Sequence, residues 1–141
     1  MAALSAQRDT KQRSGAVADR GVAAAAVIHA GAMVALNAAG DLVPFSVATT
    51  LKSDGVAQIS ATGSAVAGEV RCTVERGTFR FENSAAGDLI TKADIGNDCW
   101  GVDDQTVAKT NGGATRSIAG KIFDVDAQGV WVTFPGGQLG G

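Results

Sequence analysis

Two segments far apart in the chain share one turn pattern, which constrains the fold more than any other feature. In each, an apolar run reaches Asn or Asp, continues through two further residues to Gly, and resumes as a second apolar run; the segments are residues 34–43 (VALNAAGDLV) and 123–132 (FDVDAQGVWV). Asn or Asp accepts hydrogen bonds from turn amides, and a left-handed Gly closes a bulged hairpin. We therefore predict two β-hairpins. An internal repeat would also explain the similarity, but we favour one turn chemistry used twice.

A third hairpin is predicted over residues 69–82. The runs EVRCTVE and TFRFE alternate apolar and polar side chains, which is typical of half-buried strands. They are separated by a short Arg-Gly turn. We therefore expect the two runs to pair with each other, with their arginines and glutamates forming cross-strand ion pairs on the solvent-facing side.

Helix is expected to be scarce. Residues 91–94 (TKAD) fit a capping box, in which Thr91 is the N-cap and Asp94 accepts a hydrogen bond from its amide. Gly96 follows almost at once and limits this helix to about one turn. For the alanine run at residues 23–26 we favour an extended conformation, because glycine and β-branched residues flank it.

These elements predict an all-β domain, a small antiparallel β-barrel or β-sandwich with one short helical turn. We divide the chain into a flexible N-terminal arm (residues 1–20), a single β domain (residues 21–134) and a flexible Gly-rich tail (residues 135–141). The arm has no large apolar residue after Leu4. It is expected to be extended and free of the core.

Charge is distributed unevenly along the chain. The arm has four basic and two acidic residues, a net of +2, whereas the rest has eight basic and twelve acidic residues, a net of −4. An acidic body argues against a nucleic-acid surface, which needs clustered Lys and Arg. The basic arm is either a solvated tail or a contact for acidic groups on a partner. Its candidate contact residues are Arg8, Lys11 and Arg13.

The composition favours self-association. Hydrophobic residues make up 45% of the chain, but it has 19 glycines and no tyrosine, so the core is short of large side chains. Such domains often gain stability by oligomerising, and we expect a homotrimer. The apolar run at residues 22–36 is too short and interrupted to span a membrane, and we predict that it is buried core. A soluble protein made in the cytoplasm, without a membrane partner, is expected.

Metal binding and a disulfide are both disfavoured. Cys72 and Cys99 are far from CxxC spacing, and His29 is the single histidine of the chain. A structural zinc site would therefore lack ligands, and two free, buried thiols are the favoured state. His29 lies in an apolar run without an assignable nucleophile, so we predict a structural role for it rather than catalysis as a general base.

The stretch CWGVDDQTVAKT (residues 99–110) is the strongest candidate for a chemical site. Adjacent Asp103 and Asp104 would point to opposite faces of a strand and so could not share an ion, and Asp103 fits a turn. Asp124 and Asp126 share a strand face, but the hairpin turn occupies Asp126. Trp100 is expected in the core or at a contact. With no phosphate-binding loop or nucleophile elbow, we expect neither enzymatic activity nor a cofactor.

After its arm, the chain resembles a family of small tailed-phage and prophage proteins that decorate, or cement, the capsid. The resemblance is carried by Cys99 and by residues 31–44 (GAMVALNAAGDLVP), 90–96 (ITKADIG), 102–110 (VDDQTVAKT), 115–120 (TRSIAG) and 124–132 (DVDAQGVWV). It implies a small β-barrel or β-tulip with a terminal arm lying on the shell.

In function, the resemblance implies a structural virion protein on the outer capsid surface, made in the host cytoplasm. Similar proteins bind as trimers and clamp neighbouring subunits of the major capsid protein, without enzymatic activity. The alternative function is a β-sandwich binding module on the virion surface that recognises a host-cell glycan or another surface ligand. An exposed indole of Trp100 or Trp131 in a shallow groove would favour this alternative.

Overall fold

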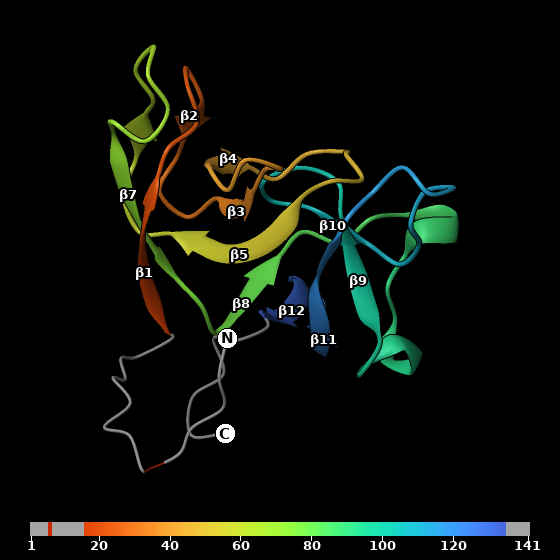
Figure 1. Ribbon diagram of the computed structural model, residues 1–141. Helices are drawn as coiled ribbons and strands as arrows, with labels where there is room; N and C mark the ends of the chain where they lie inside the picture. The colour runs from red at the N-terminus through yellow and green to blue at the C-terminus, as the bar shows by residue number, and fades with distance from the viewer. Residues whose placement is uncertain (1–5, 7–15, 135–141) are drawn as a thin grey trace.

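Two five-stranded antiparallel sheets and one two-stranded sheet form the fold of the computed structural model, which describes Ala6 and residues 16–134 (Figure 1). The first sheet has the order β1 (Val17–Gly21), β7 (Arg71–Glu75), β5 (Lys52–Ala57), β3 (Met33–Leu36) and β4 (Leu42–Pro44). The second has the order β10 (Val107–Ala108), β9 (Asp98–Gly101), β11 (Ile118–Asp126), β12 (Gly129–Thr133) and β8 (Thr78–Phe81). The two-stranded sheet pairs β2 (Val27–Ile28) with β6 (Ala61–Thr62). The all-β prediction is confirmed, and the main sheets are two open sheets.

The aromatic core, as we call it, fills the space between the two five-stranded sheets. It consists of Met33, Ala35, Phe45, Val56, Phe81, Ile90, Cys99, Val107, Ala119, Ile122, Val130, Val132 and Phe134. The rings of Phe81 and Phe134 meet edge to face, with their centroids 5.8 Å apart. A Cβ at Gly101 would lie 2.1 Å from the ring of Phe45, so only glycine fits beneath this ring. The Phe45 ring, directly after β4 of the first sheet, therefore packs against β9 of the second sheet, whereas the edge-to-face ring pair lies within the second sheet.

The aliphatic core lies on the other face of the first sheet. It consists of Val22, Ile28, Ala32, Val34, Leu42, Ala57, Cys72 and Val74. Strands β2 and β6 contribute Ile28 and the partly buried Ala61 to this side. Because side chains alternate along a strand, β3 serves both cores: Met33 and Ala35 pack in the aromatic core, and Val34 packs in the aliphatic core.

The first predicted hairpin is confirmed as β3–β4, in which Leu36 pairs with Leu42. The Asn37 side-chain oxygen accepts hydrogen bonds from the amides of Ala39 and Asp41, both at 3.0 Å. Gly40 has a φ of 87°, in the left-handed region that the turn requires.

The second predicted hairpin is confirmed as β11–β12, with Asp126 paired to Gly129. Asp126 Oδ1 accepts hydrogen bonds from the amides of Gln128 at 2.8 Å and Gly129 at 3.0 Å. Gly129 has a φ of 155°, and a Cβ there would lie 2.3 Å from the carbonyl oxygen of Phe81. The close approach of β8 therefore demands glycine at this position.

The third predicted hairpin is wrong, although both of its strands exist. Strand β7 pairs with β1 and β5 in the first sheet, whereas β8 pairs with β12 in the second. The chain passes from one sheet to the other at Arg76-Gly77. Each strand thereby buries its apolar face in a different core: Cys72 and Val74 in the aliphatic core, and Phe81 in the aromatic core.

The cross-strand ion pairs predicted for that hairpin are also replaced. Arg71 Nε binds Asp19 Oδ2 at 3.0 Å, and the Arg80 guanidinium lies 5.7 Å from the centroid of the Trp131 ring. Both arginines take partners within their own sheet, since β7 and β8 do not face each other.

The boundary of the predicted arm moves. Residues 17–20 form most of β1, which pairs with β7 along its length. This strand has few apolar side chains. It is held to the sheet by backbone pairing with β7 and by the ion pair of Arg20 with Asp54. Residues 1–5, 7–15 and the tail 135–141 lie outside the described residues.

The predicted helical turn is confirmed as a 3₁₀ turn at Lys92–Asp94, in which the Thr91 amide donates to Asp94 Oδ2 at 2.9 Å. A second 3₁₀ turn at Ala86–Asp88 was not predicted. The alanine run at residues 23–26 contains no helix, but the extended conformation favoured for it is wrong, because residues 24–25 form a turn in which Ala25 has a φ of 60°.

Candidate functional site

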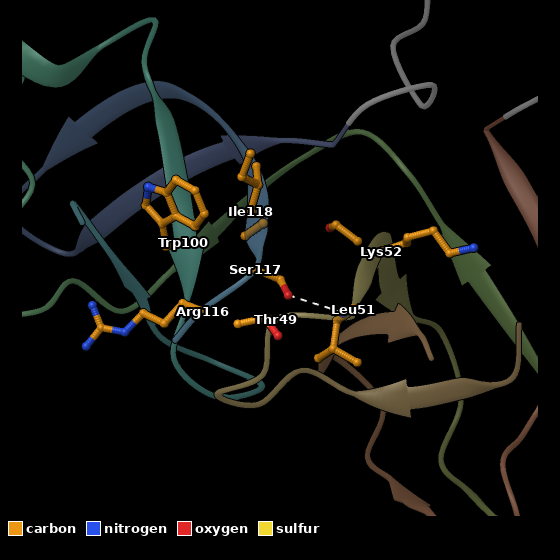
Figure 2. A pocket seen from close by; sticks show the side chains of 9 residues that line it. Thr49, Leu51, Lys52, Trp100, Arg116, Ser117 and Ile118 are labelled. Atoms are coloured by element: carbon orange, nitrogen blue, oxygen red, sulfur yellow. Dashed lines mark hydrogen bonds between the residues drawn. The ribbon is translucent and has the colours of Figure 1, made fainter. Parts of the chain in front are cut away.

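A groove of about 390 Å³ lies where the first and second sheets meet, open to solvent (Figure 2). Strand β5 and the segment before it form one side, and β9 with the start of β11 forms the other. The lining residues are Thr49, Leu51, Lys52, Ser53, Trp100, Arg116, Ser117, Ile118 and Ala119. The groove is thus built by segments that are distant in the sequence.

Trp100 provides the large aromatic surface of the groove. On β9, Cys99 and Gly101 are buried while Trp100 between them is half-buried, so the indole is on the outer face of the second sheet. Its pairing partner on β11 is Ile118, and Figure 2 shows the two side chains next to each other. Of the two positions predicted for Trp100, the aromatic core is therefore excluded.

Ser117 fixes the two sides of the groove relative to each other. Its buried hydroxyl donates to the Ala48 carbonyl at 2.5 Å. It also accepts from the Leu51 amide at 3.2 Å, the bond drawn as a dashed line in Figure 2. Two hydrogen bonds from one side chain tie the segment before β5 to the start of β11. The positions of Thr49 and Leu51 opposite the indole follow from this tie.

Two cations and no carboxylate line the groove. Arg116 Nη1 lies 3.3 Å from Asp88 Oδ2 and donates to the Thr110 carbonyl at 3.0 Å. The pKa of Asp88 is lowered, most strongly by the hydrogen bond from the Thr110 hydroxyl and further by Arg116. Lys52 is exposed and forms no ion pair with any described residue. Its positive charge is the one that remains available to a ligand.

Two buried polar side-chain atoms in the described part of the chain have no hydrogen-bond partner: Ser53 Oγ and Arg116 Nε. Both belong to residues that line the groove. An unpartnered buried polar atom is costly, and native structures contain few of them. Both atoms are covered by neighbouring atoms, and no described residue pairs with either of them.

The predicted turn role of Asp103 is confirmed, because its Oδ1 accepts a hydrogen bond from the Gln105 amide at 2.9 Å. Asp126 is occupied at both oxygens, since Oδ2 accepts from Trp131 Nε1 at 2.9 Å. This indole bond is the largest cause of the lowered pKa of Asp126. Asp124 accepts from the Val125 amide at 2.9 Å.

Within residues 16–134, no group of three or more His, Cys, Asp or Glu side chains is arranged to hold a metal ion. Cys72 and Cys99 are free and buried, as predicted. Burial raises the pKa of Cys99 to about 12 and also raises the pKa of Cys72. Both thiols are therefore protonated and weakly nucleophilic at neutral pH.

The prediction of a buried core for residues 22–36 is wrong for part of the run: residues 24, 25, 27 and 29–31, His29 among them, are exposed. The run is divided by a turn at residues 24–25 and by the short strand β2, so its side chains point both inward and outward. His29 lines a second hollow of about 260 Å³ together with Asp104 and Gln105.

A buried ionic cluster of Asp54 with Arg20 and Arg76 lies in the first sheet and was not predicted. Asp54 on β5 is 1% exposed; its Oδ2 lies 2.8 Å from Arg20 Nε and its Oδ1 lies 2.6 Å from Arg76 Nη2. Burial raises the pKa of Asp54, but the hydrogen bonds from Arg20 and Arg76 outweigh it, so the pKa is lowered overall. No sequence signal links these three positions, because 34 residues separate Arg20 from Asp54.

The predicted capsid-contact residues Arg8, Lys11 and Arg13 lie outside the described residues. No described helical segment has the length and apolar character needed to cross a membrane. Comparisons of the chain with protein-family models, with curated proteins and with solved structures found no match.

Proposed function

We propose that this protein is a structural component of a phage head, which binds the outer capsid surface as a homotrimer and stabilises neighbouring major capsid subunits. The proposal begins from the resemblance described above. The segments that carry it include the β3–β4 hairpin, the 3₁₀ turn at Lys92–Asp94, the Asp103 turn and the β11–β12 hairpin. These segments form the scaffold of the domain, as expected for a protein with a structural role.

The outer edge of β1 is the observation that carries the proposal. Among described residues, β1 pairs only with β7, so no described strand occupies its other edge. The Arg76 amide donates to the Ala16 carbonyl at 2.7 Å, which places Ala16 in the ladder and directs the backbone groups of Val17 outward. The Val17 side chain at this edge is 54% exposed.

An open strand edge next to an exposed apolar side chain can accept a strand from a partner. The rest of the basic arm precedes this strand in the sequence and contains Arg8, Lys11 and Arg13. Strand addition and apolar burial would supply most of the affinity for the shell. The basic residues would mainly speed association, because exposed ion pairs contribute up to about 1 kcal/mol each and are screened by salt.

Co-sedimentation with expanded heads that lack the protein tests this proposal, together with light scattering of the free protein. We expect a trimer in solution, saturable binding to heads, and retention in about 1 M sodium chloride, where the Debye length is about 3 Å. Val17→Pro removes an outward amide while leaving the pairing with β7, and should weaken head binding. Val47→Ala is the control, since Val47 is also 54% exposed. A monomer that leaves heads undecorated would refute the proposal.

A second candidate function rests on the groove. Trp100 is half-buried and not fully exposed, but it lines an open groove, and this arrangement supports a module that recognises a host-cell glycan. This function is compatible with attachment to a head, because no residue of β1 lines the groove.

A further inference from the structure

We propose that the groove beside Trp100 binds a saccharide that carries a carboxylate. This inference rests on the second candidate function and specifies its ligand class. It is independent of how the protein attaches to a capsid. Small-molecule sites commonly enclose about 300–1,000 Å³, and the groove, at about 390 Å³, is large enough for a short saccharide.

The indole of Trp100 supplies the surface on which a sugar ring packs. It is half-buried on the outer face of β9, and Ile118 lies beside it on β11. The C–H groups on one face of a pyranose ring form an apolar surface that complements a flat aromatic ring. The tie through Ser117 holds the opposite side of the groove in place, so little ordering is needed when a ligand enters.

The charge of the groove selects an anionic sugar. Residues 21–141 are acidic overall, with eight basic and twelve acidic residues, yet no carboxylate lines the groove. Asp88 already neutralises Arg116, at 3.3 Å. Lys52 is left without an ion-pair partner among the described residues. Its side chain extends away from Trp100 in Figure 2, and rotation of this exposed, flexible side chain would bring the ammonium group to a uronate carboxylate in the groove.

Hydroxyl recognition would come from the remaining polar wall. The Thr49 hydroxyl makes no hydrogen bond to a described residue, and Ser53 Oγ is unpartnered. Ser53 Oγ is covered in this structure, so it reaches a ligand only after rotation about χ1. A few convergent polar groups beside one aromatic surface are typical of a small-molecule site.

Titration followed by NMR tests the proposal, because the two indole N–H signals report separately on the groove and on the rest of the same sheet. The probes are trigalacturonate, its methyl ester and maltotriose. Trigalacturonate should shift the Trp100 indole signal and leave that of Trp131, whose N–H is held by Asp126. The methyl ester and maltotriose should bind at least several-fold more weakly, since they lack the charge that Lys52 recognises.

Variants sharpen the test. Trp100→Ala should weaken trigalacturonate binding by about tenfold or more, and Trp100→Phe, which keeps a flat ring, should weaken it less. Lys52→Gln should remove the preference for trigalacturonate over its methyl ester. Lys92→Gln is the matched control, because Lys92 is an exposed lysine outside the groove. Binding measured for Trp131→Phe should be unchanged.

The outcomes separate this inference from the proposed attachment to heads. No shift with trigalacturonate, equal shifts of both indoles, or equal affinity for the methyl ester would each overturn the saccharide site. None of these results affects head binding, and Trp100→Ala should decorate heads as the unmodified protein does. A protein that binds trigalacturonate through Trp100 but leaves heads undecorated would overturn the capsid proposal alone.

Discussion

The two faces of the first sheet are stabilised in different ways. The aromatic core on one face contains three buried phenylalanines, Phe45, Phe81 and Phe134, and Phe79 packs against it. The aliphatic core on the other face has no aromatic ring; its members are Val, Ala, Leu, Ile and Cys. The first sheet, which carries the aliphatic core, also contains the Asp54 cluster that links β1 to the rest of the sheet.

This difference shows how a chain with few large side chains divides its stabilising groups. The buried phenylalanine rings lie in the core between the two five-stranded sheets, where each aromatic side chain buries a large area. The first sheet is assembled from distant segments: the contact of Arg71 with Asp19 spans 52 residues. There, ion pairs and backbone pairing take the place of large apolar contacts. We therefore expect the aromatic core to be the more stable half.

The largest effect should come from removing a ring. Phe45→Ala should lower the free energy of unfolding by about 3–5 kcal/mol, because Gly101 beneath the ring offers no side chain to fill the cavity. Val74→Ala in the aliphatic core should cost about 2 kcal/mol. Phe123→Ala is the control, within about 0.5 kcal/mol of the unmodified protein, since Phe123 is 64% exposed. Urea unfolding measures all three free energies, and equal costs in the two cores would contradict the expectation that the aromatic core is the more stable half.

A smaller effect is expected from the ionic cluster. Asp54→Asn should destabilise the protein by about 1–3 kcal/mol, because a buried hydrogen-bonded charge is lost while Arg20 and Arg76 can still reach solvent. The exposed pair of Asp19 with Arg71 is the control, and Asp19→Asn should cost at most about 1 kcal/mol.

The same variant has a defined pH dependence. The lowered folded-state pKa of Asp54 stabilises the protein above the unfolded-state pKa of about 3.9 and ceases to do so as the pH falls through the folded-state value. The stability difference between the unmodified protein and Asp54→Asn should be constant above about pH 5 and shrink in acid. A difference that grows as the pH falls would contradict the assigned role of Asp54.

The smallest effect, a difference in local opening, can be measured because each core holds one cysteine. Cys72 lies in the aliphatic core and Cys99 in the aromatic core, and neither should react with a thiol reagent without opening. In Cys99→Ala and Cys72→Ala variants, which leave one thiol each, Cys72 should be labelled roughly tenfold faster than Cys99 at low denaturant. Equal rates would mean that the two cores open together.

The sequence predicted the elements whose signals are local. The turns at Asn37 and Asp126, the capping box at Thr91 and the turn at Asp103 were found because each side chain bonds backbone a few residues away. The alternation of residues 69–82 likewise located β7 and β8. Their pairing could not be predicted, because a short turn and two alternating runs are equally compatible with a crossing between sheets.

The candidate groove could not be predicted from the sequence either, because it depends on how distant segments are brought together. Its residues come from three separate stretches, 49–53, Trp100 and 116–119. Alternation along β9 did carry one signal, since a tryptophan between two small buried residues points outward. No local sequence signal indicates that Lys52 has no ion pair, or that Ser53 Oγ has no hydrogen-bond partner, among the described residues.

Local signals in the sequence were sufficient to predict short antiparallel strands with defined turns, two buried thiols and very little helix. Contacts in the folded chain establish which strands pair, where β1 begins, how Asp54 is neutralised and where the groove opens. The physical reason is range: turn and strand preferences depend on neighbours within a few residues, whereas strand pairing, burial and charge compensation depend on contacts between segments that only the folded chain brings together.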